Sequence, residues 1–174
     1  EAAGFEAVDA RRKEFVRHAN TDPTSVLKVY EASGIGEAGP SVSALIPTAV
    51  AGRDDHLGHL MKQLEEQTFQ DFEVVLVRGD TRQGRALNMA AAAARGPLLI
   101  IMDDDTSLGH PEVFEYLVNV MKAHDDIGMA GVANTVPQDA TWLVRRVMTE
   151  IPRRHSDVVS ELVDSDMAEH PCCA

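Results

Sequence analysis

The stretch Pro97-Leu98-Leu99-Ile100-Ile101-Met102-Asp103-Asp104-Asp105 joins an apolar run directly to three consecutive carboxylates. A short apolar run of this kind predicts a buried strand over 98–102. Like charges at close range repel each other, so the acids stay ionised readily only in water or beside a cation. Because hard divalent metals prefer oxygen ligands, the stretch predicts a strand that delivers acids to a metal site. A solvated acidic turn is the alternative interpretation.

Hydrophobic periodicity on both sides of this stretch alternates between that of strands and that of helices. Strands are predicted at 42–46, where Pro47 should end the strand, and at 71–77, 98–102 and 127–132, with 158–163 and 172–174 as further candidates. Helices are predicted at 57–64, 84–95, 111–121 and 142–148. This alternation predicts an α/β fold with a mostly parallel sheet flanked by helices.

Ligands of such sheets bind beyond the carboxyl ends of the strands. Three predicted strand ends carry suggestive residues, namely Pro47-Thr48, Arg78-Gly79-Asp80 and Asp103-Asp104-Asp105. We therefore expect these three segments to meet at one edge of the sheet.

The first forty residues differ from the rest of the chain. Apolar residues at roughly helical spacing predict a helix near 5–16 and a second short helix at 26–30, followed by a glycine-rich linker at 34–40. We interpret 1–40 as an N-terminal helical extension and linker, and 41–174 as the α/β domain.

Composition argues against several classes of function. The chain has 174 residues and a net charge of -12, which argues against a nucleic-acid surface and against docking on anionic lipid. No stretch approaches the apolar length of a membrane span. The two cysteines, Cys172 and Cys173, are adjacent, and the lack of a disulfide framework favours an intracellular protein.

Four blocks, in order along the chain, resemble the family-2 glycosyltransferases of the GT-A fold. The blocks are a strand ending in Pro47-Thr48, the Gln-Thr step and strand of 67–77, the Gly-Arg-x-x-Asn helix of 84–88 that runs into Ala-Ala-Arg-Gly at 93–96, and the strand entering the Asp-x-Asp motif of 103–105 before His110-Pro111. The resemblance covers about residues 41–135. The family usually carries an acidic pair after its second strand, and those positions here are Arg78-Gly79, with Asp80 one step later.

The resemblance implies a metal-dependent enzyme that moves a sugar, with inversion, from a nucleotide diphosphate to an acceptor hydroxyl. It implies a UDP- or GDP-linked donor, Mn²⁺ or Mg²⁺, a glycan, lipid or small-molecule acceptor, and a cytoplasmic location near the inner face of a membrane. Residues 41–174 would form the nucleotide-sugar-binding domain, with its acceptor-side part incomplete. A nucleotide-binding module or fragment without transferase activity is the main alternative. A nucleotidyltransferase is a third, although 48–55 holds a single glycine rather than a glycine-rich phosphate loop.

The same resemblance suggests roles for individual residues. Asp105 is the expected metal ligand, and Asp103 is expected to reach the metal or the ribose. Asp104 would contribute instead if the backbone turns there, because alternate residues of an extended segment point to opposite sides. The residues expected to contact the nucleotide sugar are Thr48, Ala49, Arg78, Asp80, Arg85, Asp103 and Asp104. The catalytic base is expected beyond Ala174.

Overall fold

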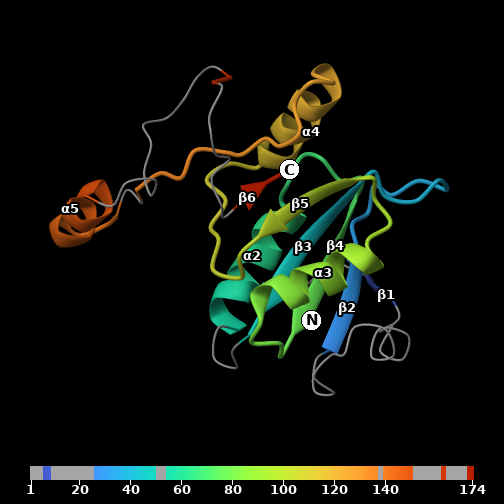
Figure 1. Cartoon of the computed structure of the whole chain (residues 1–174), viewed down its shortest axis with the longest axis horizontal. Coiled ribbons are helices and arrows are strands. Elements are labelled where there is room, and N and C mark those ends of the chain that lie inside the picture. Colours follow the sequence, from blue (N-terminus) through green and yellow to red (C-terminus); the bar gives the residue numbers. More distant parts are fainter. Residues whose placement is uncertain (1–5, 9–25, 50–53, 137–138, 151–161, 164–171) are drawn as a thin grey trace.

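The computed structural model describes residues 6–8, 26–49, 54–136, 139–150, 162–163 and 172–174. These residues include a six-stranded sheet of order β1-β2-β4-β3-β5-β6 (Figure 1). The strands are β1 (Glu6–Val8), β2 (Val26–Glu31), β3 (Val42–Thr48), β4 (Phe72–Arg78), β5 (Leu98–Met102) and β6 (Cys172–Cys173). The helices are α2 (Asp54–Glu65), α3 (Gln83–Ala93), α4 (Val113–Ala123) and α5 (Trp142–Glu150).

The predicted α/β class is confirmed, and its parallel part lies in the centre of the sheet. Strand β3 pairs in parallel with β4 on one side and with β5 on the other. The outer pairs β1–β2, β2–β4 and β5–β6 are antiparallel. The sheet is therefore mixed, with the carboxyl ends of three neighbouring parallel strands at one edge.

The helix predicted at 26–30 is wrong, because Val26–Glu31 forms strand β2 along the whole length of β4. Leu27 and Val29 are buried and Lys28 is exposed, which is the two-residue alternation of a strand. Five residues are too few to separate that alternation from helical spacing. Of the helix predicted near 5–16, the described part, Glu6–Val8, is strand β1, and the remainder lies outside the described residues.

The strand predicted at 127–132 is also wrong, since this segment holds only an isolated bridge between Gly131 and Cys173. Backbone hydrogen bonds join Ala130 and Ala174 in both directions, at 2.8 and 2.7 Å. The C-terminal strand predicted at 172–174 is confirmed as β6, and it lies between β5 and this segment. Because β6 has only two residues, it is too short to pair with a strand over the whole of 127–132. Of 158–163, the described residues 162–163 are irregular and exposed.

Strand β3 continues past the predicted stop at Pro47. Its pairing with β5 ends at Leu45↔Ile101, whereas its pairing with β4 continues to Thr48↔Arg78. Every residue of β3 is buried, as expected for the central strand of a sheet covered on both faces. The strand therefore carries the chain to the sheet edge where Ala49 emerges.

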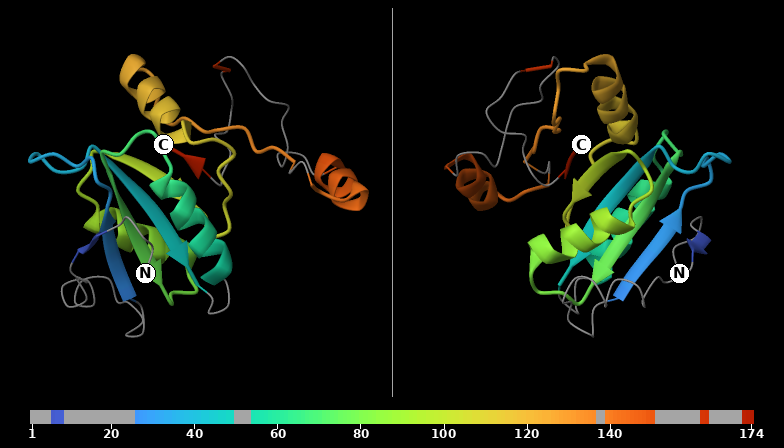
Figure 2. Two further views of the ribbon diagram at one scale, coloured as in Figure 1. Left: turned by 180° about the vertical axis from the view of Figure 1, so that it is seen from behind. Right: turned by 45° about the vertical axis from the view of Figure 1, so that its right-hand side comes forward.

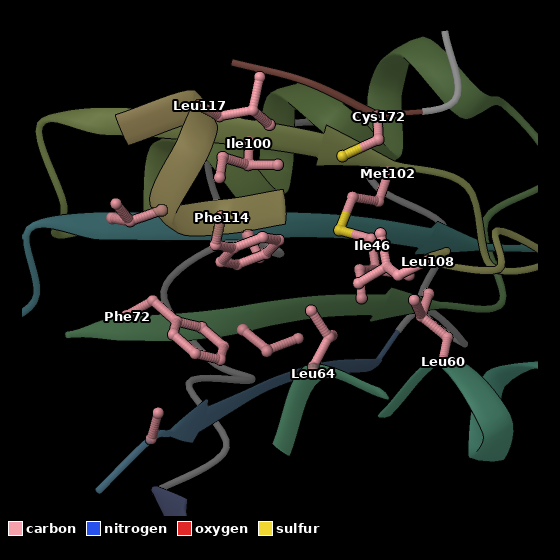
Figure 3. Close-up of a cluster of buried hydrophobic side chains, with 14 of the residues drawn as sticks. Ile46, Leu60, Leu64, Phe72, Ile100, Met102, Leu108, Phe114, Leu117 and Cys172 are labelled. Carbon is pink, nitrogen blue, oxygen red and sulfur yellow. The ribbon is translucent and has the colours of Figure 1, made fainter. Parts of the chain in front are cut away.

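Two apolar clusters cover the two faces of the sheet. One joins alternate residues of β3, β4 and β5 to α2 and α4, and the other joins Leu45, Val75 and Val77 to β2 and to the alanine-rich face of α3. Figure 3 shows the first cluster, in which the Phe72 and Phe114 rings meet edge to face with centroids 5.0 Å apart. This packing holds the three parallel strand ends in a fixed arrangement, which Figure 2 shows from two further sides.

Candidate functional site

An open cleft of about 290 Å³ lies where β3, β4 and β5 end. Its walls come from the segment after each of these strands and from the start of α3. The lining residues are Pro47, Ala49, Asp80, Thr81, Gln83, Asp103, Asp104 and Asp105. Four of the eight are carboxylates, so the cleft is strongly acidic. The three segments that the sequence predicted to meet are therefore together at one edge of the sheet.

The acidic triplet turns immediately after β5. The backbone N–H of Thr106 donates to the carbonyl oxygen of Asp103 at 3.2 Å, which closes a turn over residues 104 and 105. Asp103 is half-buried, Asp104 is buried and Asp105 is exposed. The extended arrangement considered from the sequence is not adopted, and all three residues line the cleft. Asp104 therefore lines the cleft, as expected from the sequence for a backbone that turns at this point.

Gln83 was not anticipated from the sequence. It is the first residue of α3, it lines the cleft, and its Nε2 donates to Oδ1 of Asp103 at 3.0 Å. This hydrogen bond ties the helix after β4 to the acidic turn after β5. The signal in the sequence was its place at the start of a helix that follows a strand end, because such positions point toward the ligand edge of an α/β sheet.

Asp80 anchors the start of α3. Its side chain is fully buried, and Oδ1 accepts the backbone N–H of Arg82 at 3.0 Å while Oδ2 accepts Nε of Arg85. The preceding Gly79 has φ of +89°, a left-handed conformation that glycine adopts without strain. The glycine that replaces an acid of the family pattern is therefore needed for the chain reversal that directs Asp80 to the helix.

The remaining residues expected to contact the donor lie beside the described cleft lining rather than in it. Arg85 is half-buried in its ion pair with Asp80. Thr48 is buried, and its carbonyl oxygen accepts the N–H of Gly79 at 2.9 Å. Arg78 is half-buried at the position opposite Thr48. Of the predicted set, Ala49, Asp80 and the three consecutive aspartates line the cleft.

The carboxylates fit a divalent metal that takes only part of its shell from protein. Among the described residues, no group of three or more His, Cys, Asp or Glu side chains is arranged to hold a metal ion. Mg²⁺ and similar ions at phosphate sites are typically bound by one or two carboxylates, with phosphate oxygens and water completing the shell. Asp103 and Asp105 offer hard oxygen donors of that kind on the cleft wall.

The two cysteines lie behind the acidic turn, and both have a thiol pKa above the ordinary value. Burial, with a smaller effect of Cys173, raises the pKa of Cys172 to about 12. Burial and then the charge of Asp103 raise the pKa of Cys173. Both side chains are therefore neutral thiols at pH 7. The oxygen donors on this side of the sheet are the carboxylates of the cleft.

Comparison with known proteins gives one match. The family model described as "Glycosyl transferase family 2" matches residues 51–174, which include α2, α3 and the acidic turn. No curated protein and no solved structure matches the chain. Across the residues that the structure describes, no helix is long and apolar enough to cross a membrane.

Proposed function

Because the chain belongs to glycosyl transferase family 2, we propose that its acidic cleft binds a nucleotide-diphosphate sugar through a divalent metal and that the protein transfers the sugar to an acceptor hydroxyl. The observation that carries this proposal is the convergence of Asp80 and the three consecutive aspartates on one cleft at the ends of β4 and β5. A diphosphate is anionic, and an acidic cleft would repel it without a cation between them. The acidic lining therefore favours donor binding through a metal.

The chain's own residues have distinct roles in this proposal. Asp105 and Asp103 would hold the metal, and the bound metal would neutralise charge on the leaving diphosphate as a Lewis acid. Gln83 fixes one oxygen of Asp103 and so limits which way that carboxylate faces. Asp80 holds the first turn of α3 against the cleft, where the partial positive charge of a helix N-terminus favours phosphate oxygens.

Transfer with inversion also needs a carboxylate that accepts the proton of the acceptor hydroxyl. We assign this role to no residue of the described part of the chain. Donor turnover therefore separates the proposed transferase from the alternative, a nucleotide-binding module without transferase activity. A protein that binds the donor but neither hydrolyses it nor transfers its sugar to any acceptor would be the module.

Calorimetric titration with UDP and with GDP, each with and without Mn²⁺, tests the proposal. We expect binding of one nucleotide that requires the metal, and we expect Asp105→Ala to reduce it below detection. Asp125→Ala is a matched control, since it removes an exposed acid beyond α4 and should leave binding unchanged. Metal-independent binding, equal effects of the two variants, or no binding of either nucleotide would contradict the proposal.

A further inference from the structure

Helix α5 exposes an apolar face that the described part of the protein does not cover. Leu143 and Val147 are 56% and 49% exposed, Val144 is 43% exposed, and all three share one face of the helix with Met148. By contrast, α4 buries Phe114, Leu117 and Val118 against the sheet. In every view α5 lies apart from the sheet and its covering helices (Figure 1, Figure 2). An apolar helix face left in water indicates a binding surface.

The polar side of α5 is basic, unlike the rest of this acidic chain. Arg145 and Arg146 are exposed, and Trp142, in the first turn, is 77% exposed. Residues 141–155 hold four arginines and one glutamate, so they carry +3 within a chain of net charge -12. The ion pair of Arg146 with Glu150 is exposed, and pairs of this kind exchange partners at little cost. Positive charge and exposed apolar surface therefore coincide on this one segment.

We propose that α5 docks on the surface of an anionic lipid bilayer. An amphipathic helix with apolar residues on one side and arginine on the other is a combination that lies in the membrane interface. The overall charge of -12 predicts repulsion from such a surface, but charges farther away than about 8 Å are largely screened at physiological salt. The net charge of +3 over residues 141–155 therefore acts at the point of contact, where the rest of the chain opposes it only weakly.

A bilayer suits this surface better than a second copy of the chain. The helix has 9 residues, which gives it a length of roughly 14 Å. A stable protein–protein interface buries about 800 Å² on each partner, more than one face of so short a helix presents. A bilayer needs no complementary groove, so a short apolar face with flanking arginines can bind it. The proposal is independent of the sugar transfer proposed above, and its test needs no nucleotide.

Co-sedimentation with vesicles tests the proposal without relying on Trp142, which lies on the arginine side of α5. Vesicles of phosphatidylcholine with phosphatidylglycerol should sediment the protein in a saturable manner, and vesicles of phosphatidylcholine alone should not. The double variant Arg145→Glu/Arg146→Glu should weaken this binding by about tenfold or more. Leu143→Asp/Val147→Asp should weaken it similarly by removing the apolar anchor.

Tyr116→Asp is the control, since it places one aspartate on an exposed aromatic residue of α4 and should leave vesicle binding unchanged. The variants lie on exposed positions, so unchanged circular dichroism should accompany each. The proposal is overturned if anionic vesicles do not sediment the protein, or if both double variants bind as the wild type does. A dimer that forms without vesicles as the protein concentration rises, and that Leu143→Asp/Val147→Asp dissociates, would also overturn it and would identify a second copy as the partner.

Discussion

The two edges of the central sheet both carry buried or half-buried acids, but these acids have different partners. At the amino edge, Glu73 is fully buried at the start of β4. At the carboxyl edge, Asp103 and its neighbours line an open cleft. Acids at strand ends are thus no sign of a site by themselves. What differs is how completely the protein surrounds the carboxylate.

The amino edge closes around Glu73. Its Oε1 accepts Ser43 Oγ at 2.8 Å and the backbone N–H of Arg95 at 2.7 Å, and its Oε2 accepts Nε of Arg95 at 2.7 Å. The Arg95 guanidinium also binds Glu31, which lies directly opposite Glu73 in the β2–β4 ladder. Burial lowers the pKa of Arg95, but its hydrogen bonds to Glu73 and Glu31 raise it by more, so the cation persists between two acids.

The largest effect is expected from opening this closed edge with Arg95→Met. The substitution leaves the Glu73 carboxylate buried without its cation, so the free energy of unfolding should fall by about 3 kcal/mol. Urea unfolding followed by circular dichroism measures it. Replacing both partners, as Glu73→Leu/Arg95→Met, should restore part of the loss because no buried charge remains.

Arg146→Met is the matched control for Arg95→Met. Arg146 pairs with Glu150 on the exposed surface of α5, and removal of such a pair should change stability by less than about 0.5 kcal/mol. Equal losses of unfolding free energy in the two arginine variants would show that Arg95 does not stabilise the buried Glu73 carboxylate.

The next largest effect concerns the backbone of the same edge. A Cβ atom on Gly96 would lie 2.5 Å from the Val42 carbonyl carbon and 2.7 Å from the Ser43 nitrogen. Because backbone cannot yield cheaply there, Gly96→Ala should cost about 2 kcal/mol in the free energy of unfolding. Its control is Gly84→Ala in α3, where a Cβ atom meets open space. That variant should be neutral or stabilising by up to about 1 kcal/mol, and a similar loss in both would contradict the close packing of Gly96.

A smaller effect is expected at the open edge, on binding rather than on stability. Gln83→Ala removes the hydrogen bond to Asp103 and should weaken Mn²⁺-dependent nucleotide binding by about tenfold, as loss of an orienting partner of a metal ligand does. The free energy of unfolding should stay within about 0.5 kcal/mol, because Gln83 is exposed. Gln83→Asn has a shorter side chain and should recover little of the lost affinity. An unchanged affinity in Gln83→Ala would show that Gln83 does not position Asp103.

The contrast between the edges was only partly predictable from the sequence. The apolar runs of β3, β4 and β5 are typical of doubly covered strands, so the meeting of their carboxyl ends could be predicted. Strand β2 could not be predicted, since the alternation around Leu27 and Val29 is too short to exclude a helix. The partners of individual charged residues could not be predicted either. Gln83 meets Asp103 from 20 residues away, and tertiary packing decides that contact.

The smallest effect is expected at the two cysteines, which should react slowly because they lie buried behind the cleft. Cys172 and Cys173 lie directly behind the acidic turn, yet both are buried and hold their protons. Only a thiolate attacks iodoacetamide, and the pKa of Cys172, raised to about 12, keeps its thiolate scarce at pH 8. We therefore expect mass spectrometry to find no alkylation of the folded protein at pH 8 and alkylation of both cysteines in urea. Labelling of the folded protein at the unfolded rate would mean that solvent passes behind the turn. The cleft would then reach through the sheet edge, and the aspartates would lack the packed wall that fixes them toward a ligand.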